Sequence, residues 1–212
     1  TNPTAVNLLL ALDWLTCSIA GRLDVPFGKV ERLDAEALSY RDDESWLPRF
    51  VARHNPDSGE FVILMLALAP HLDPGFLEKL IAGRLPEGSE FPEFGGVRSA
   101  NYRGILPTGE TAQFILAGND LEKRLSVQRI LGADHWFSQK RILWLEPVRE
   151  GEPVMSGRLV LDAELTEEIV TGKVSRPMFS VTFPAEYIET KMDWDDLVLH
   201  PNTLIQIREI EN

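Results

Sequence analysis

Apolar residues recur at helical spacing along the first 130 residues of this chain. Asn2 and Thr4 can cap a first helix that runs to about Gly21. We expect its buried side to carry Val6, Leu9, Leu10, Trp14 and Cys17. The pattern therefore predicts that this helix belongs to a hydrophobic core.

Four further helices are predicted before residue 90, and the first is a short one around Ala35 to Leu38. Residues 46–54 form a short one, and a very apolar helix starts at residue 57 or 58 and runs through Leu68. Asp73 can cap the next helix, with Pro74 in its first turn and Gly83 just past its end. So far the chain is predicted to be helical throughout.

The stretch from Phe94 to Gly118 is rich in glycine and changes from loop to helix. Four of its residues match the spacing of the phosphate-binding loop GxxxxGK[ST], namely Gly104, Gly109, Glu110 and Thr111. Glu110 stands where that loop needs a lysine, and a carboxylate there would repel phosphate. The sequence therefore favours a turn at residues 107–109 that starts a helix ending at Gly118, rather than a nucleotide site.

The character of the chain changes after that helix. Asn119 and Glu122 are spaced as a capping box for a helix through Ile130. Arg141–Val148 and Ser156–Leu161 are β-prone runs separated by a loop, which predicts a hairpin.

Three more elements are predicted towards the end of the chain. Asp162 can cap a short helix that Gly172 ends. Residues 179–183 and 187–190 are predicted to be extended, and Pro201 lies in the first turn of a last helix.

Together these elements predict an α+β fold that is mainly α-helical, with a β-hairpin or small sheet in the C-terminal half and elements that a winged helix would share. Residues 1–90 are predicted to be a helical subdomain. Residues 91–190 are predicted to be a mixed α/β subdomain packed on the first, and residues 191–212 a linker followed by a helix.

Composition and charge exclude several classes of protein. Cys17 is the only cysteine among 212 residues, which excludes an internal disulfide and a cysteine metal cluster and favours a cytoplasmic location. The formal charge of −12 disfavours binding to nucleic acid or to an anionic membrane and favours a basic protein partner. The apolar runs at residues 8–12 and 61–70 are too short to span a membrane and predict buried helices.

The sequence contains no motif that assigns a catalytic, cofactor-binding or metal-binding residue. The four histidines match no metal-ligand or hydrolase spacing: His54, His71, His135 and His200. Arg98 and Arg103 lie among glycines and could shape an anion pocket or a docking loop, or they could pair with surplus carboxylates. The candidate interaction surface therefore comprises Arg98, Arg103, Glu110 and Trp194.

Three stretches together resemble one protein family: Phe94–Gly118, Ile142–Leu161 and Phe183–Asn212. The family is the bacterial AAA+ ATPases encoded beside contractile, phage-tail-like injection systems, and the resemblance is to their N-terminal region. It implies a ring-forming parent that uses ATP and Mg to assemble or remodel the contractile particle. This chain would be its non-catalytic recognition domain, and residues 191–212 would lead into the AAA+ module. Its partners would be that module and protein components of the particle.

Two other functions remain open from the sequence. A free-standing enzyme or anion-binding protein would use Arg98 and Arg103 to hold an anionic substrate. A winged-helix module would use residues 121–130 as its recognition helix and residues 142–161 as its wing, although the negative charge argues against DNA as its ligand.

Overall fold

The structure is a computed structural model that describes residues 2–24, 38–82, 84 and 92–173. By its internal contacts the chain divides into two units, Thr1–Val174 and Ser175–Asn212. The second unit lies outside the described residues, and so do Trp194, the predicted extended segments and the predicted last helix. The predicted boundary between residues 90 and 91 falls inside the first unit, and the division into subdomains stays a prediction.

The described residues form eight α-helices and one small sheet. The helices are α1 (Pro3–Leu23), α2 (Trp46–His54), α3 (Ser58–Leu72), α4 (Phe76–Ile81), α5 (Gly109–Ala117), α6 (Leu121–Ile130), α7 (Trp136–Gln139) and α8 (Ala163–Thr171). Strands β1 (Leu143–Leu145) and β2 (Leu159–Leu161) pair antiparallel, and a 3-10 helix, η1 (Val154–Ser156), lies in their connection. The predicted class, mainly helical with a hairpin in the C-terminal half, is confirmed.

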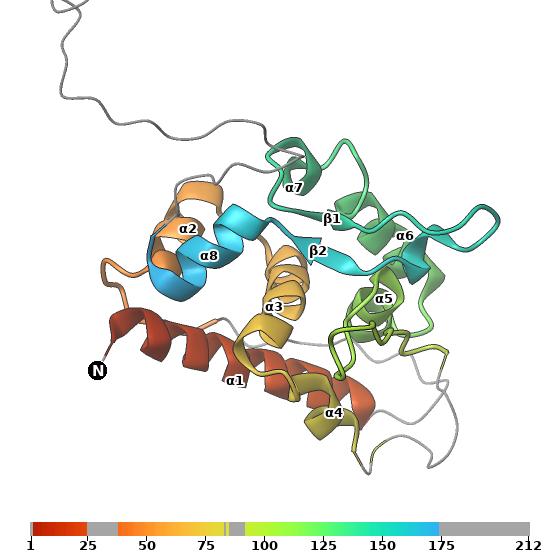
Figure 1. The fold of residues 1–212 in the computed structure, drawn as a ribbon, viewed down its shortest axis with the longest axis horizontal. Helices are drawn as coiled ribbons and strands as arrows, with labels where there is room; N and C mark the ends of the chain where they lie inside the picture. Colours follow the sequence, from red (N-terminus) through yellow and green to blue (C-terminus); the bar gives the residue numbers. More distant parts are fainter. Residues whose placement is uncertain (1, 25–37, 83, 85–91, 174–212) are drawn as a thin grey trace, which may run out of the picture. The chain divides into compact units, whose positions relative to one another are not determined.

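Helix α3 lies at the centre of the hydrophobic core (Figure 1). Every residue from Phe61 to Pro70 is buried, so the helix is covered on all sides. It packs against α1, α4, α5, α8 and β2, which come from both before and after it in the sequence. A capping box between Asp57 and Glu60 closes its first turn. The predicted apolar helix is confirmed and extends to Leu72.

Helix α1 buries a different side from the one that the sequence predicted. Its buried apolar residues are Leu8, Ala11, Leu15 and Ile19. Leu9, Leu10 and Cys17 are exposed, so their predicted place in the core is wrong. Apolar residues surround most of this helix, so apolar spacing alone does not select one side. The buried side is the one whose polar residues form hydrogen bonds. Asn7 donates to Ser45, just before α2, and Arg22 Nε donates to a carbonyl of α5.

One described helix, α1, is long and apolar enough to cross a membrane by length and composition alone. A helix of a protein core passes the same test, and α1 packs against α2, α3, α4 and α5. The cytoplasmic location stays a prediction.

Helix α4 begins later than the sequence predicted. Its first residue is Phe76, and Pro74 lies outside it. The Asp73 carboxylate accepts hydrogen bonds from the Gly75 amide and the Lys79 ammonium group. These bonds hold Asp73 within its own turn, so it does not cap a helix that starts at Pro74.

The other predicted helix ends agree more closely with the structure. Asp162 caps α8 and Gly172 ends it, as predicted. Helix α6 is capped by Asp120, whose Oδ1 accepts a hydrogen bond from the Lys123 amide at 3.2 Å, and not by the predicted Asn119.

The fully buried Asn7 side chain gives a test of how α2 is attached to α1. Its Nδ2 donates to Arg41 O, Asp43 Oδ1 and Ser45 Oγ at 2.9 to 3.2 Å. Asn7→Asp replaces these donors with a buried carboxylate beside that of Asp43, so we expect a loss of about 2–4 kcal/mol in unfolding free energy. Urea denaturation measures this loss. The matched change Asn119→Asp, at an exposed site, should cost under about 0.5 kcal/mol, and an equal loss in both variants would contradict the argument.

Candidate functional site

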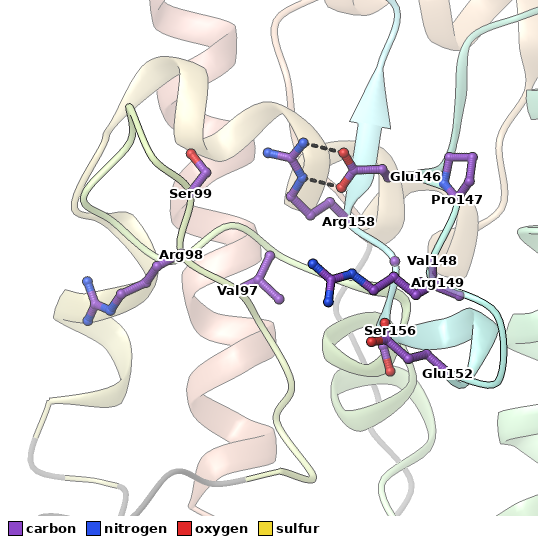
Figure 2. Close-up of a pocket in the computed structure, with 11 residues that line it drawn as sticks. Val97, Arg98, Ser99, Glu146, Pro147, Val148, Arg149, Glu152, Ser156 and Arg158 are labelled. Carbon is purple, nitrogen blue, oxygen red and sulfur yellow. Dashed lines mark hydrogen bonds and ion pairs between the residues drawn. The ribbon is translucent and has the colours of Figure 1, made fainter.

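A groove of about 370 Å³ lies between the loop Val97–Ser99 and the connection from β1 to β2 (Figure 2). We call it the arginine groove because Arg98, Arg149 and Arg158 line it. Its other lining residues are Val97, Ser99, Glu146, Pro147, Val148, Glu152, Ser156 and Gly157. Three arginines against two glutamates give this lining a formal charge of +1, although the whole chain carries −12.

Two glycines shape the loop that forms the first wall. Gly95 and Gly96 have φ of 66° and 89°, which side-chain-bearing residues rarely adopt. A Cβ at Gly95 would also lie 2.6 Å from Thr108 Oγ1. After them, Val97 and Leu106 exchange two backbone hydrogen bonds of 3.0 and 2.8 Å. These constraints fix the loop where it meets the groove.

The β1–β2 connection forms the opposite wall. Gly157 approaches the end of β1 so closely that a Cβ there would lie 2.3 Å from Glu146 O. Its carbonyl accepts a hydrogen bond from the Gly109 amide at 3.1 Å, and Arg158 forms an antiparallel bridge with Thr108. The N-terminus of α5 therefore anchors both walls, since Thr108 Oγ1 also accepts a hydrogen bond from the loop at Gly96.

Arg158 and Glu146 form a bidentate ion pair across the hairpin, drawn with dashed lines in Figure 2. Arg158 Nε and Nη2 each donate to one carboxylate oxygen at 2.5 Å. These hydrogen bonds, with a smaller Coulombic contribution, lower the pKa of Glu146 and raise the pKa of Arg158. Each charge is satisfied by the other, so the pair stiffens one edge of the groove.

Arg149, unlike Arg158, has no carboxylate partner within the described part of the chain. Its side chain extends across the groove toward Val97 (Figure 2). It has no ion pair with any residue that the structure describes. A guanidinium in this position can offer its N–H groups to a bound anion.

The two predicted arginines do not converge on one ligand position. Arg98 lines the groove, but its side chain is 66% exposed and its Nη1 donates to the backbone carbonyl of Arg103. The same Nη1 lies 4.0 Å from Glu78 Oε1. Arg103 is exposed and does not line the groove. Arg98 is therefore at the candidate site, whereas Arg103 contributes a backbone carbonyl that holds Arg98.

The start of α5 has the geometry of a helix cap, as the sequence predicted. Thr108 and Thr111 form a capping box, and the amide of Gly109 is already bonded to the hairpin. A Cβ at Gly109 would lie 2.8 Å from Met155 Cε, so Met155 occupies the space in front of this glycine. The amide and the space that a phosphate would use here are filled by the protein itself.

Glu110 serves to join two helices. Its Oε2 accepts a hydrogen bond from Arg124 Nη2 at 2.5 Å, which links α5 to α6. The same guanidinium donates to Gln113 Oε1 and to the carbonyl of Gly118. Of the four residues predicted to form an interaction surface, Glu110 is thus committed to an internal contact, and Trp194 lies outside the described residues.

The sequence prediction missed Glu146, Arg149 and Arg158. Glu146 and Arg158 lie within the two predicted β-prone runs, next to the observed strands, and an antiparallel register places these opposite charges across from each other. Nothing local signals that the loop at residues 97–99 comes to lie against this connection.

Comparisons with known protein families, with curated proteins and with solved structures find no match to this chain. Within the described residues, no group of three or more His, Cys, Asp or Glu side chains is arranged to hold a metal ion.

The Glu146–Arg158 pair predicts a pH dependence with a definite sign. A carboxylate whose pKa is lowered in the folded state contributes stability above its unfolded pKa, and this contribution is lost as pH falls through the folded pKa. We expect carboxyl-carbon NMR to find Glu146 titrating below the usual range for glutamate, and Arg158→Gln to raise its pKa. The control Arg129→Gln, on α6, should leave it unchanged. A Glu146 pKa that does not respond to Arg158→Gln would disprove the assignment.

Proposed function

We propose that this chain is the recognition domain of a AAA+ ATPase of the type encoded with contractile injection systems, and that the arginine groove holds an acidic segment of a particle protein. ATP binding and hydrolysis then belong to a AAA+ module elsewhere in the parent protein. The parent is a ring-forming, cytoplasmic ATPase that assembles or remodels the particle.

The observation that carries this proposal is how the resembling stretches meet. Phe94–Gly118 supplies the loop wall of the groove, and Ile142–Leu161 supplies the hairpin wall. The third stretch, Phe183–Asn212, lies outside the described residues. Two separate segments that resemble one family thus face each other across one cavity, which supports a shared binding role.

The charge and exposure of the groove support an acidic protein segment as its ligand. The overall charge of −12 favours basic partners over most of the surface, whereas within the groove Arg149 and Arg158 balance Glu146 and Glu152. Arg149 provides an unmatched guanidinium. Val154, in the same β1–β2 connection, is 69% exposed and adds apolar surface to that segment. Arginine beside exposed apolar surface is typical of protein interfaces.

The enzyme alternative has less support from the same geometry. It requires Arg98 and Arg103 to converge with a carboxylate or histidine in a deep pocket. Among the described residues, Arg103 lies outside the groove and Arg98 is held by a backbone carbonyl. The winged-helix assignment of α6 and the hairpin stays a prediction.

Calorimetry with ATP and Mg²⁺ tests where the nucleotide binds. We expect no binding heat from this chain, because Met155 fills the space at Gly109 and Glu110 adds negative charge. The full-length parent should bind and hydrolyse ATP. Turnover or binding by this chain alone would refute its assignment as the non-catalytic part. A parent without ATPase activity would refute the family assignment.

Charge reversal in the groove tests the docking surface. Arg149→Glu should weaken binding to the particle protein about tenfold or more, because the acidic segment would meet a carboxylate. Biolayer interferometry with each structural protein encoded beside the parent gene measures the affinity. The matched control is Arg129→Glu, an exposed arginine of α6, which should change the affinity by less than about twofold. Equal effects of the two reversals, or no effect of Arg149→Glu, would rule out the groove as the docking site.

A further inference from the structure

A second cavity, of about 380 Å³, lies between α2, α8 and the start of β1. We call it the aromatic pocket. Its lining residues are Trp46, Arg49, Phe50, Arg53, His54, Ile142, Leu165 and Glu168. None of them belongs to the arginine groove, so a ligand in the aromatic pocket would bind independently of the proposed docking function.

Four of the lining residues are apolar, and we call them the floor of the aromatic pocket. Trp46 and Phe50 are each 5% exposed and stack with ring centroids 4.7 Å apart. Ile142, just before β1, and Leu165 of α8 add aliphatic surface. A flat apolar body can bury its surface against these side chains, since stacked aromatic residues already fix their shape.

The rim of the pocket carries unmatched positive charge. Arg49 and Arg53 lie one turn apart on α2, so their side chains are neighbours. Both are exposed, and neither forms an ion pair with any residue of the described part of the chain. Glu168 on α8 is the acidic residue of the lining. Two guanidiniums and one carboxylate leave a formal charge of +1, which a monoanion would neutralise.

His54 adds an unused polar group to this wall. Its Nδ1 is buried without a hydrogen-bond partner among the described residues. The ring stacks on Trp136 at a centroid distance of 5.1 Å and an interplanar angle of 8°. Burial, with the nearby charges of Lys140 and Arg53, lowers the pKa of His54 and favours its neutral form. An unpaired buried nitrogen beside a cavity calls for an explanation, and a polar ligand is one.

We propose that the aromatic pocket binds a small aromatic carboxylate. The ligand's ring lies against Trp46 and Phe50, and its carboxylate accepts hydrogen bonds from Arg49 and Arg53 at the rim. The volume falls in the range of small-molecule sites, about 300–1,000 Å³. The charge of the lining selects one negative charge, and the stacked floor selects a planar body.

The test is a titration of the full chain with 3-phenylpropionate and with its uncharged analogue 3-phenylpropanamide, followed by protein chemical shifts in NMR. The carboxylate should bind and shift the resonances of Trp46 and Ile142. The amide should bind about tenfold or more weakly, because it cannot form the charge-assisted hydrogen bonds. Equal affinity for acid and amide, or no saturable shift with the acid, would overturn the proposal.

Variants at the rim locate the binding without disturbing the core. Arg49→Gln and Arg53→Gln are at exposed positions and should each weaken 3-phenylpropionate binding about tenfold. Arg129→Gln, which removes the same charge from α6, should leave the affinity unchanged. Leu165→Trp should block the pocket, with circular dichroism to confirm that the helices are intact. If the affinity is the same in Arg49→Gln, Arg53→Gln and Arg129→Gln, the acid binds elsewhere and the proposal is wrong.

Discussion

The complete burial of α3 is the constraint on which the other elements depend. Its apolar residues face every direction, and each large side chain removed from water contributes roughly 1.5–3 kcal/mol. One neighbouring helix cannot cover such a surface, so α1 and α4 cover part of it and α5, α8 and β2 cover the rest. Packing on α3 brings β2 beside the N-terminus of α5, where both walls of the arginine groove are anchored. The aromatic pocket shares this dependence, because α8 packs on the same helix.

Much of the local structure could be predicted because its signals are local. The turn at residues 107–109, the capping residue Asp162 and the ending glycine Gly172 each act within a few residues of themselves, and each was identified from the sequence. The buried side of α1 could not be identified in this way. Leu8 and Leu9 are equally apolar, and the choice between them rests on partners such as Ile115, whose carbonyl accepts from Arg22, ninety-three residues away. Sequence periodicity contains no information about such distant contacts.

The candidate sites depend even more on contacts between residues that are distant in the sequence. Arg98 was identified from its glycine-rich surroundings, but the opposite wall of the groove carries Arg149, which follows a hairpin strand. Glu110 stood out because it replaced a lysine in a motif, yet its role is an ion pair with Arg124 on the next helix. The motif explains why Glu110 does not fit a phosphate loop. It does not indicate what the residue does, since that depends on how α5 and α6 pack.

Arg149 lies among acidic residues in the sequence and still forms no ion pair with a described residue. With 33 acidic residues against 21 basic ones, a cation of this chain has carboxylates to choose from. Arg149 even has Glu150 and Glu152 close by in sequence. Gly151 of the turn there has a φ of 86°, and the Glu152 amide donates a hydrogen bond to the Arg149 carbonyl. The Arg149 side chain points across the groove (Figure 2). An arginine side chain that forms no ion pair can still bind an anionic ligand, because its charge is neither paired nor desolvated within the protein. Within the described part of the chain, Arg49 and Arg53 of α2 also form no ion pair, and both line the aromatic pocket.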